Sequence, residues 1–292
     1  MAGSLTVVGS GIDAVLHLTP ETEACIKAAE IVYFCVCDPV AQIVIMELNS
    51  NCVDLFPFYS EDVPRYVTYR KMTNVVVGSV RRGLNVCMVF YGHPGVCATS
   101  PHAAIAEVRK FGAPARMLPS ISSHDAMFAE LGIDPGLLGC QIYEATSYLT
   151  RERKYDVNTP LVLYQLGAIG DINFYLGGFP KICMHLLIET LGAQYGVDHG
   201  CVLYSAPNTP FSKPEIIRCT IGAIDQSVVR MAHTLYLPPK GEPPRKADMI
   251  ERIHSIRDEY YVANGRPTKG DWPQNSETFD EHPGAKAYDS AI

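Results

Sequence analysis

The turn Tyr91-Gly92-His93-Pro94-Gly95 carries residue types suited to holding a small ligand. Its glycines lack the Cβ atoms that would keep a ligand from the backbone, Pro94 fixes one φ angle, and Tyr91 and His93 add a polar aromatic face. The turn follows the apolar run Val86–Phe90, which is typical of a buried central strand. Ligands of α/β proteins bind where the chain leaves such strands, so we predict a ligand site here; a plain strand-to-helix connection is the alternative.

Small and polar residues also end several other apolar runs. Because the carboxyl ends of parallel strands meet at one edge of a sheet, we expect these segments to gather around the same site. They are Gly9-Ser10-Gly11 after 4–8, Pro119–Ser123 after 115–118, Gly167 after 161–166, and Ala206-Pro207 after 201–205.

The first part of the chain alternates predicted strands with predicted helices. The patterns predict strands over 4–8, 31–36, 53–58, 85–90 and 115–118, and helices over about 20–29, from 39, over 66–82 and after the turn at 91–95. Thr19 and Asp38 each precede a proline, which is typical of a helix N-terminus. This alternation indicates an α/β fold with a mostly parallel sheet covered on both faces.

The second part has a different spacing. Closely spaced strands over 161–166, 201–205, 215–220 and 234–237, with a helix over 182–194, predict a second, mixed sheet. Beyond Pro239 the chain is rich in proline and charge, and only 247–261 has a helical pattern. We therefore predict an N-terminal Rossmann-like α/β subdomain over 1–116, a C-terminal α/β subdomain over 117–239, and a helix with a polar, linker-like tail over 240–292.

Composition excludes several classes of protein. The chain has 292 residues, a net charge of −7 and no apolar run near the length that crosses a bilayer, and its first residues do not resemble a secretory signal. The negative charge argues against nucleic acid as a partner. Its ten cysteines include no C-x-x-C pair with a matching partner pair, which disfavours zinc and disulfides. We expect a cytoplasmic, metal-free globular protein that does not associate with membranes.

Ordered motifs along the chain carry a resemblance to a known superfamily. The segments VVGSGID, VFYGHPGV, RMLPSISS, LYQLG and YSAPNTP resemble those of the tetrapyrrole methylases. The segments NCVDLFPFYSEDVPRYVTYRKM, GIDPG and YEAT resemble more closely the borosin α-N-methyltransferases, which methylate backbone amides of a peptide. The resemblance implies two α/β subdomains with S-adenosylmethionine in the cleft between them, and S-adenosylhomocysteine as the product.

The resemblance also implies which residues act. It places Tyr59, Arg65 and Tyr69 at the catalytic positions. Our hypothesis is that Tyr69, activated by Arg65, removes the amide proton while Tyr59 donates to the carbonyl oxygen. Arg65 and Tyr69 are four residues apart, so both face the same way if the segment is helical. The implied cofactor contacts are Tyr91, His93, Val96, Ser122, Gln165, Ala206, His233 and Thr234.

The substrate and the assembly are predicted in the same way. Many borosins carry an aliphatic substrate segment at the carboxyl terminus, whereas Val262–Ile292 is polar and holds several prolines. We therefore expect the split form, a homodimer acting on a separate precursor peptide with an aliphatic core. The alternatives are a methyltransferase of a corrinoid or porphyrin precursor, which would lack the Tyr59, Arg65 and Tyr69 set, and a noncatalytic peptide-binding module.

Overall fold

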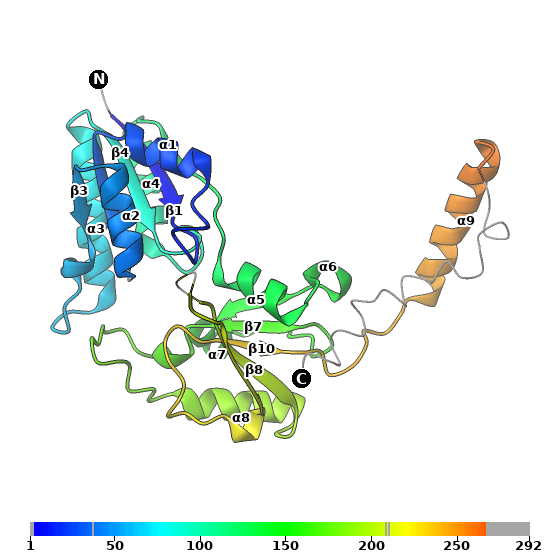
Figure 1. The fold of residues 1–292 in the computed structure, drawn as a ribbon. Helices are drawn as coiled ribbons and strands as arrows, with labels where there is room; N and C mark the ends of the chain where they lie inside the picture. Colours follow the sequence, from blue (N-terminus) through cyan, green and yellow to red (C-terminus); the bar gives the residue numbers. More distant parts are fainter. Residues whose placement is uncertain (1–2, 37, 208, 210, 267–292) are drawn as a thin grey trace.

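The computed structural model describes residues 3–36, 38–207, 209 and 211–266. These residues form two five-stranded sheets, each with helices on both faces, and one further helix that projects away from both (Figure 1). The predicted α/β class is confirmed.

The first sheet is entirely parallel, in the order β3-β2-β4-β1-β5. Helices α1 (Pro20–Ala28) and α2 (Pro39–Leu48) cover one face, and α3 (Arg65–Arg81) and α4 (Thr99–Lys110) cover the other. The strands are β1 (Ser4–Gly9), β2 (Ile31–Cys35), β3 (Cys52–Asp54), β4 (Asn85–Phe90) and β5 (Ala115–Met117).

Burial on both faces explains the apolar runs of the central strands, such as Val86–Phe90 in β4. In β1, Val7 packs toward α3 and α4 while Val8 packs toward α1 and α2, and both are fully buried. The helix starts are set locally, because Thr19 and Asp38 accept hydrogen bonds from the first free N–H groups of α1 and α2.

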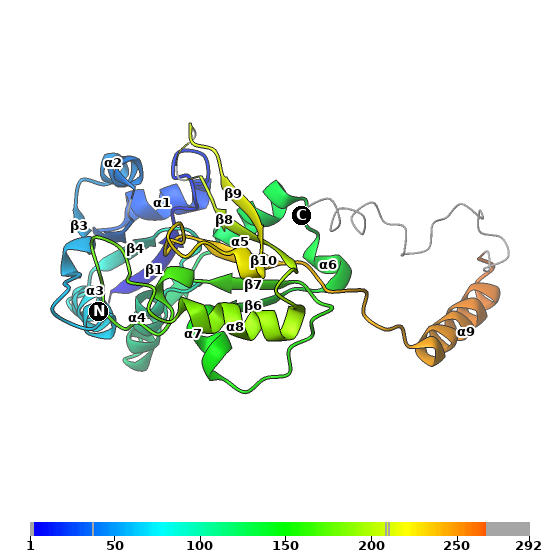
Figure 2. The ribbon, with the colours of Figure 1, turned by 90° about the horizontal axis from the view of Figure 1, so that it is seen from below.

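The second sheet is mixed, in the order β6-β7-β10-β8-β9, with only β6 and β7 parallel. Helices α5 (Ser123–Leu131) and α6 (Pro135–Leu138) lie on one face, and α7 (Ala145–Thr150) and α8 (Met184–Tyr195) lie on the other (Figure 2). The strands are β6 (Gln141–Glu144), β7 (Leu161–Tyr164), β8 (Gly200–Ser205), β9 (Glu215–Thr220) and β10 (Thr234–Leu237).

The strand directions bring the ends of three strands to one edge of this sheet. Both β7 and β8 pair antiparallel with β10, which lies between them. The carboxyl ends of β7 and β8 therefore lie beside the amino end of β10. This edge is next to the carboxyl edge of the first sheet, where β4 ends (Figure 1).

Some predicted elements are wrong in extent. The strand predicted over 53–58 stops at Asp54 and gives way to the 3-10 helix η1 (Phe56–Phe58), because Pro57 has no N–H for a strand ladder and the Asp54 carboxylate accepts from the Phe56 N–H at 2.8 Å. The strand predicted over 161–166 stops at Tyr164, because Gln165 adopts φ +61° and leads into η2 (Leu166–Ala168). The sequence analysis missed β6 and the helices α5, α6 and α7.

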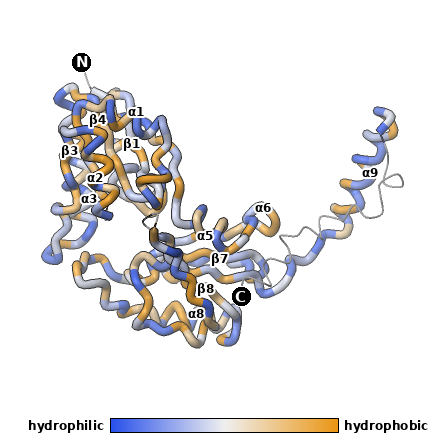
Figure 3. The backbone as a smooth tube through the Cα atoms, viewed as in Figure 1, coloured by the Kyte–Doolittle hydropathy of each residue, from blue (hydrophilic) through white to orange (hydrophobic). Residues whose placement is uncertain are grey.

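The chain after β10 leaves the two sheets. Helix α9 (Ala247–Ala263) stands apart from them and has no buried residue. Figure 3 shows hydrophobic and hydrophilic residues alternating along it, whereas the strands are mainly hydrophobic. The predicted helix over 247–261 is confirmed; most of the predicted polar tail, residues 267–292, lies outside the described residues.

Candidate active site

One cavity of about 800 Å³ lies between the two sheets, and residues from both halves line it. The sequence-predicted site residues come from segments far apart in the chain, yet the structure brings all of them to this cavity. The lining includes Tyr59, Arg65, Tyr69, Tyr91, His93, Val96, Ser122, Gln165, Ala206, His233 and Thr234.

Helix α3 positions two of the three predicted catalytic residues. Its buried face, which includes Met72 and Val76, packs on the first sheet. Arg65 and Tyr69 continue the same face toward the helix amino terminus, because side chains three or four residues apart share a face. They line the cavity.

Aromatic rings surround Tyr59, which follows η1. The Tyr59 ring stacks on Phe174 at 4.6 Å between centroids and meets the Tyr69 ring nearly edge-on at 6.2 Å. Phe56 packs against both Tyr59 and Phe174. This packing restricts both tyrosine rings, so their hydroxyl groups have little freedom relative to one another.

The loop after η2 anchors Arg65. The Arg65 Nη2 donates to the carbonyl oxygen of Asp171 at 2.6 Å, and the Arg65 backbone N–H donates to the Ile172 carbonyl at 2.8 Å. The guanidinium carbon lies 5.2 Å from the centre of the Phe179 ring. No carboxylate of the described residues forms an ion pair with Arg65. A backbone carbonyl and an aromatic ring thus hold the Arg65 cation, and no carboxylate of the described residues neutralises its charge in the cavity.

The sequence analysis missed this loop as part of the site. Residues 174–179 all line the cavity and include Phe174, Tyr175 and Phe179. The signal was present in the composition, since FYLGGF places three aromatic side chains around a glycine pair. The Glu61 carboxylate accepts from the Leu176 N–H at 2.6 Å, which adds a second link between this loop and the first half of the chain.

Ser122 begins α5 through a capping box with Asp125. The Ser122 N–H and hydroxyl both donate to the Asp125 carboxylate at 2.7 Å. The His124 ring hydrogen-bonds to the Tyr164 hydroxyl at the end of β7. Burial lowers the pKa of His124 and raises the pKa of Tyr164, so both groups are neutral near neutral pH.

His233 is fully buried beside the cavity. Its Nδ1 accepts from the Arg230 N–H at 3.1 Å, and its Nε2 lies 2.9 Å from the Glu215 carboxylate. Burial, together with the Arg230 and Lys181 cations, lowers the pKa of His233 to about 4. The ring is therefore a neutral imidazole whose proton sits on Nε2.

The lining suits S-adenosylmethionine, the predicted cofactor. Gly92 has φ +68°, and a Cβ built there would meet no atom closer than 3.8 Å, so the backbone stays open to a ligand. Gln165 and Thr234 offer amide and hydroxyl groups suited to adenine and ribose. Lys181 and Arg230 add cations suited to a carboxylate. Residue types and volume thus fit the group.

The described residues hold no group of three or more His, Cys, Asp or Glu side chains placed to bind a metal ion. Within the same residues, every helix is too short or too polar to cross a bilayer.

Solved structures of methyltransferases share this fold. Uroporphyrin-III-C-methyltransferase from Thermus thermophilus matches 85% of this chain and 100% of its own, with a TM-score of 0.59 at 15% identity. Cobalt precorrin-4 methyltransferase matches 82% of this chain and 96% of its own, with a TM-score of 0.58 at 14% identity. At these identities the similarity concerns the fold.

Residues 4–221 match the family described as Tetrapyrrole (Corrin/Porphyrin) Methylases. The chain belongs to this family of methyltransferases, and the predicted superfamily and fold are confirmed.

Proteins similar in sequence are described as methyltransferases together with cyclic peptide precursors. The chain is 39% identical over 280 residues to a methyltransferase and type I borosin cyclic peptide precursor of Coprinopsis marcescibilis, covering 94% of this chain and 71% of that protein. It is 40% identical over 259 residues to a methyltransferase and cyclic gymnopeptides precursor of Gymnopus fusipes, covering 87% of this chain and 62% of that protein. The predicted borosin relationship is confirmed. Both relatives are described as methyltransferase and precursor together, so the predicted separate peptide stays a prediction.

Proposed function

We propose that this chain methylates backbone amides of a ribosomally made precursor peptide, with S-adenosylmethionine as methyl donor. The observation that carries the proposal is that Tyr59, Arg65 and Tyr69 line the same cavity as the strand-end residues expected to hold the cofactor. The relatives, described as methyltransferases joined to cyclic peptide precursors, support a peptide as the substrate class.

An amide nitrogen is a weak nucleophile because its lone pair is delocalised into the carbonyl. Its methylation requires loss of the N–H proton and stabilisation of negative charge on the carbonyl oxygen. In the proposed step Tyr69 removes the amide proton, activated by Arg65, which lies four residues away on the same helix face and lines the same cavity. The Tyr59 hydroxyl donates to the carbonyl oxygen, where the charge develops.

The methyl donor brings an electrophilic sulfonium methyl group when bound. The turn at Tyr91 and His93, together with Gln165 and Ala206, would hold its adenosyl part at the strand ends. The aromatic residues around Tyr59 would exclude water from the reacting nitrogen, which strengthens the charge interactions there.

The separate peptide and the homodimer belong to this proposal as well. Exposed apolar side chains support association with a second chain: Ile43 and Met46 on α2 are 56% and 54% exposed, and Ile256 on α9 is 66% exposed. Sedimentation at micromolar concentration tests the dimer, and a species of 32.1 kDa would contradict it.

Mass spectrometry tests the function directly. The purified chain is incubated with S-adenosylmethionine and a synthetic aliphatic peptide, and fragment ions locate any added CH2 units. Increments on backbone amides of the added peptide are expected. Increments confined to the chain itself would contradict the separate peptide, methylation only of an offered tetrapyrrole precursor would favour the corrinoid alternative, and binding without transfer would favour the noncatalytic one.

A further inference from the structure

The cavity wall formed by residues 229–234 has no regular secondary structure until β10 begins at Thr234. All six residues line the cavity, and five of them, 229–233, precede β10. A wall of this kind needs contacts outside itself to keep one shape, because backbone ordering costs free energy at every residue.

His233 closes the turn through its own backbone and ring. The His233 N–H donates to the Arg230 carbonyl at 3.1 Å, and the Arg230 N–H donates to His233 Nδ1 at 3.1 Å. Because Nδ1 accepts, the proton of the neutral ring lies on Nε2. The Nε2–H group is therefore the one donor of the ring, and it points out of the turn toward Glu215.

Glu215, the first residue of β9, receives that donor. Its Oε2 lies 2.9 Å from His233 Nε2 and also pairs with the Arg230 guanidinium. Glu215 itself is outside the cavity lining. One carboxylate thus contacts both ends of the closed turn, and His233, fully buried, would otherwise leave its Nε2–H unsatisfied.

The backbone of the turn also packs on η2. A Cβ built on Gly167 would lie 2.8 Å from the Met231 nitrogen and 3.0 Å from the Arg230 carbonyl carbon. The turn is therefore in close backbone contact with Gly167 and is also held by the carboxylate of Glu215. The contact at Gly167 leaves the turn little room there, and Glu215 holds the side chains of both residues that close it.

We propose that Glu215 is a positioning residue for the cofactor-binding wall 229–234 and acts through the ring of His233. The role in cofactor binding rests on the proposed function; the effect on the turn does not. Losing the carboxylate frees His233 Nε2, loosens the turn and weakens the contacts of Arg230 and Thr234 with the cofactor.

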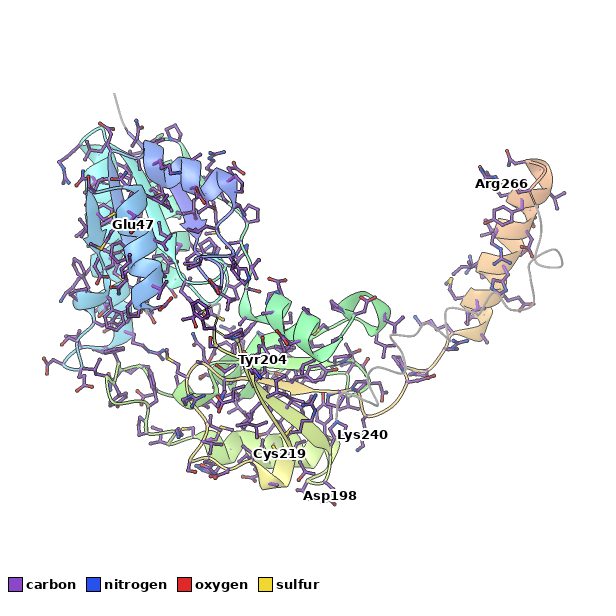
Figure 4. All side chains as sticks on the ribbon, viewed as in Figure 1. Glu47, Asp198, Tyr204, Cys219, Lys240 and Arg266 are labelled. Carbon is purple, nitrogen blue, oxygen red and sulfur yellow. The ribbon has the colours of Figure 1, made fainter. Side chains whose placement is uncertain are left out.

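The test compares Glu215→Ala and Glu215→Gln with the unchanged chain. Glutamine retains an oxygen that accepts from His233 Nε2, whereas alanine does not. A matched control is Asp198→Ala, an exposed carboxylate at the opposite end of β8 from Tyr204 (Figure 4). Hydrogen exchange of the Arg230 amide in the ligand-free chain reports on the turn, and calorimetry reports on binding of S-adenosylhomocysteine.

For Glu215→Ala we expect roughly tenfold faster exchange of the Arg230 amide and roughly tenfold weaker binding. Glu215→Gln and Asp198→Ala should stay within about threefold of the unchanged chain in both measurements. Unchanged exchange in Glu215→Ala, or equal effects of alanine and glutamine, would overturn the proposal. If the alanine variant does not fold, Glu215→Asp, which withdraws the carboxylate by one methylene, must still speed the exchange.

The two measurements separate the inference from the proposed function. If the unchanged chain does not bind S-adenosylhomocysteine, the proposed function fails while the exchange comparison still decides the role of Glu215 in the turn. If it binds, and Glu215→Ala speeds exchange without weakening binding, the positioning role for the cofactor is wrong.

Discussion

Arg65 and Asp171 join the two halves of the molecule at the candidate site: Arg65 Nη2 donates to the Asp171 carbonyl oxygen at 2.6 Å across 106 residues of sequence. The backbone N–H of Arg65 repeats the link with the Ile172 carbonyl. The first residue of α3 is thus fixed by a loop of the second half. This explains how a helix start without a side-chain cap holds a cation in a defined place.

Replacing Arg65 tests this arrangement. Arg65→Ala removes the cation proposed to activate Tyr69, and we expect methylation to fall by about 10²–10³-fold in kcat. Arg65→Lys keeps the charge but loses the planar donor set, so it should recover only part of the rate. Initial rates of peptide methylation measure both, and a near-normal rate for Arg65→Ala would remove Arg65 from the reaction.

Tyr69→Phe removes the proposed base while leaving the ring contact with Tyr59. We expect a loss of about 10²–10⁴-fold in kcat, the usual range for a positioned acid or base, with little change in binding of S-adenosylhomocysteine. The control is Tyr195→Phe, which removes a buried hydroxyl without a hydrogen-bond partner among the described residues. Single-turnover methylation rates of the two variants are the measurement. Equal rates for Tyr69→Phe and Tyr195→Phe would contradict the role of Tyr69.

Phe174→Ala removes the ring that stacks on Tyr59. An aromatic pair contributes about 1 kcal/mol beyond its area, so we expect KM for the peptide to rise roughly fivefold or more. Phe211→Ala is the matched control, because that ring is 95% exposed. A similar KM for both variants would indicate that the stack does not order the site.

Gly167→Ala should displace the cavity wall. The added methyl would lie 2.8 Å from the Met231 backbone nitrogen, and backbone cannot move aside as a flexible side chain can. We expect roughly tenfold weaker binding of S-adenosylhomocysteine by calorimetry. Gly241→Ala, whose Cβ would meet its nearest neighbour at an ordinary 3.6 Å, should leave binding unchanged.

His233 should make stability depend on pH. Its pKa is lowered to about 4 in the folded chain, against about 6.5 when unfolded, so between these values the unfolded state takes up a proton that the folded state does not. Stability is fully present above about pH 6.5 and is lost as pH falls toward about 4. Arg230 and Lys181 favour this neutral ring, and the Glu215 carboxylate opposes it.

Urea unfolding at about pH 7 and about pH 5 measures the effect. We expect His233 to contribute a loss of about 2 kcal/mol between the two. In His233→Asn that contribution should disappear, so the variant should lose correspondingly less stability on acidification. An unchanged pH difference would show that His233 is not the titrating group.

Local patterns in the sequence predicted how parts of the site are placed, whereas the choice of Tyr59, Arg65 and Tyr69 came from the family resemblance. The four-residue spacing of Arg65 and Tyr69 placed both on one helix face, and the apolar run before Tyr91 placed that turn at a strand end. Such features depend on residues that are close in sequence, within one or two turns of a helix or within one strand. They follow from backbone periodicity and from the burial of apolar side chains.

Only the tertiary structure decided the contacts between distant segments. The backbone of Gln165 turns left-handed inside an apolar run, Phe174 stacks on Tyr59, and Glu215 reaches His233. The FYLGGF segment marks Phe174 as unusual, but the sequence does not give its partner, because each of these arrangements depends on how the two sheets pack and on which loop fills the space between their edges. Hydrophobic burial is not directional, so the sequence pattern selects buried faces but does not specify which loops meet.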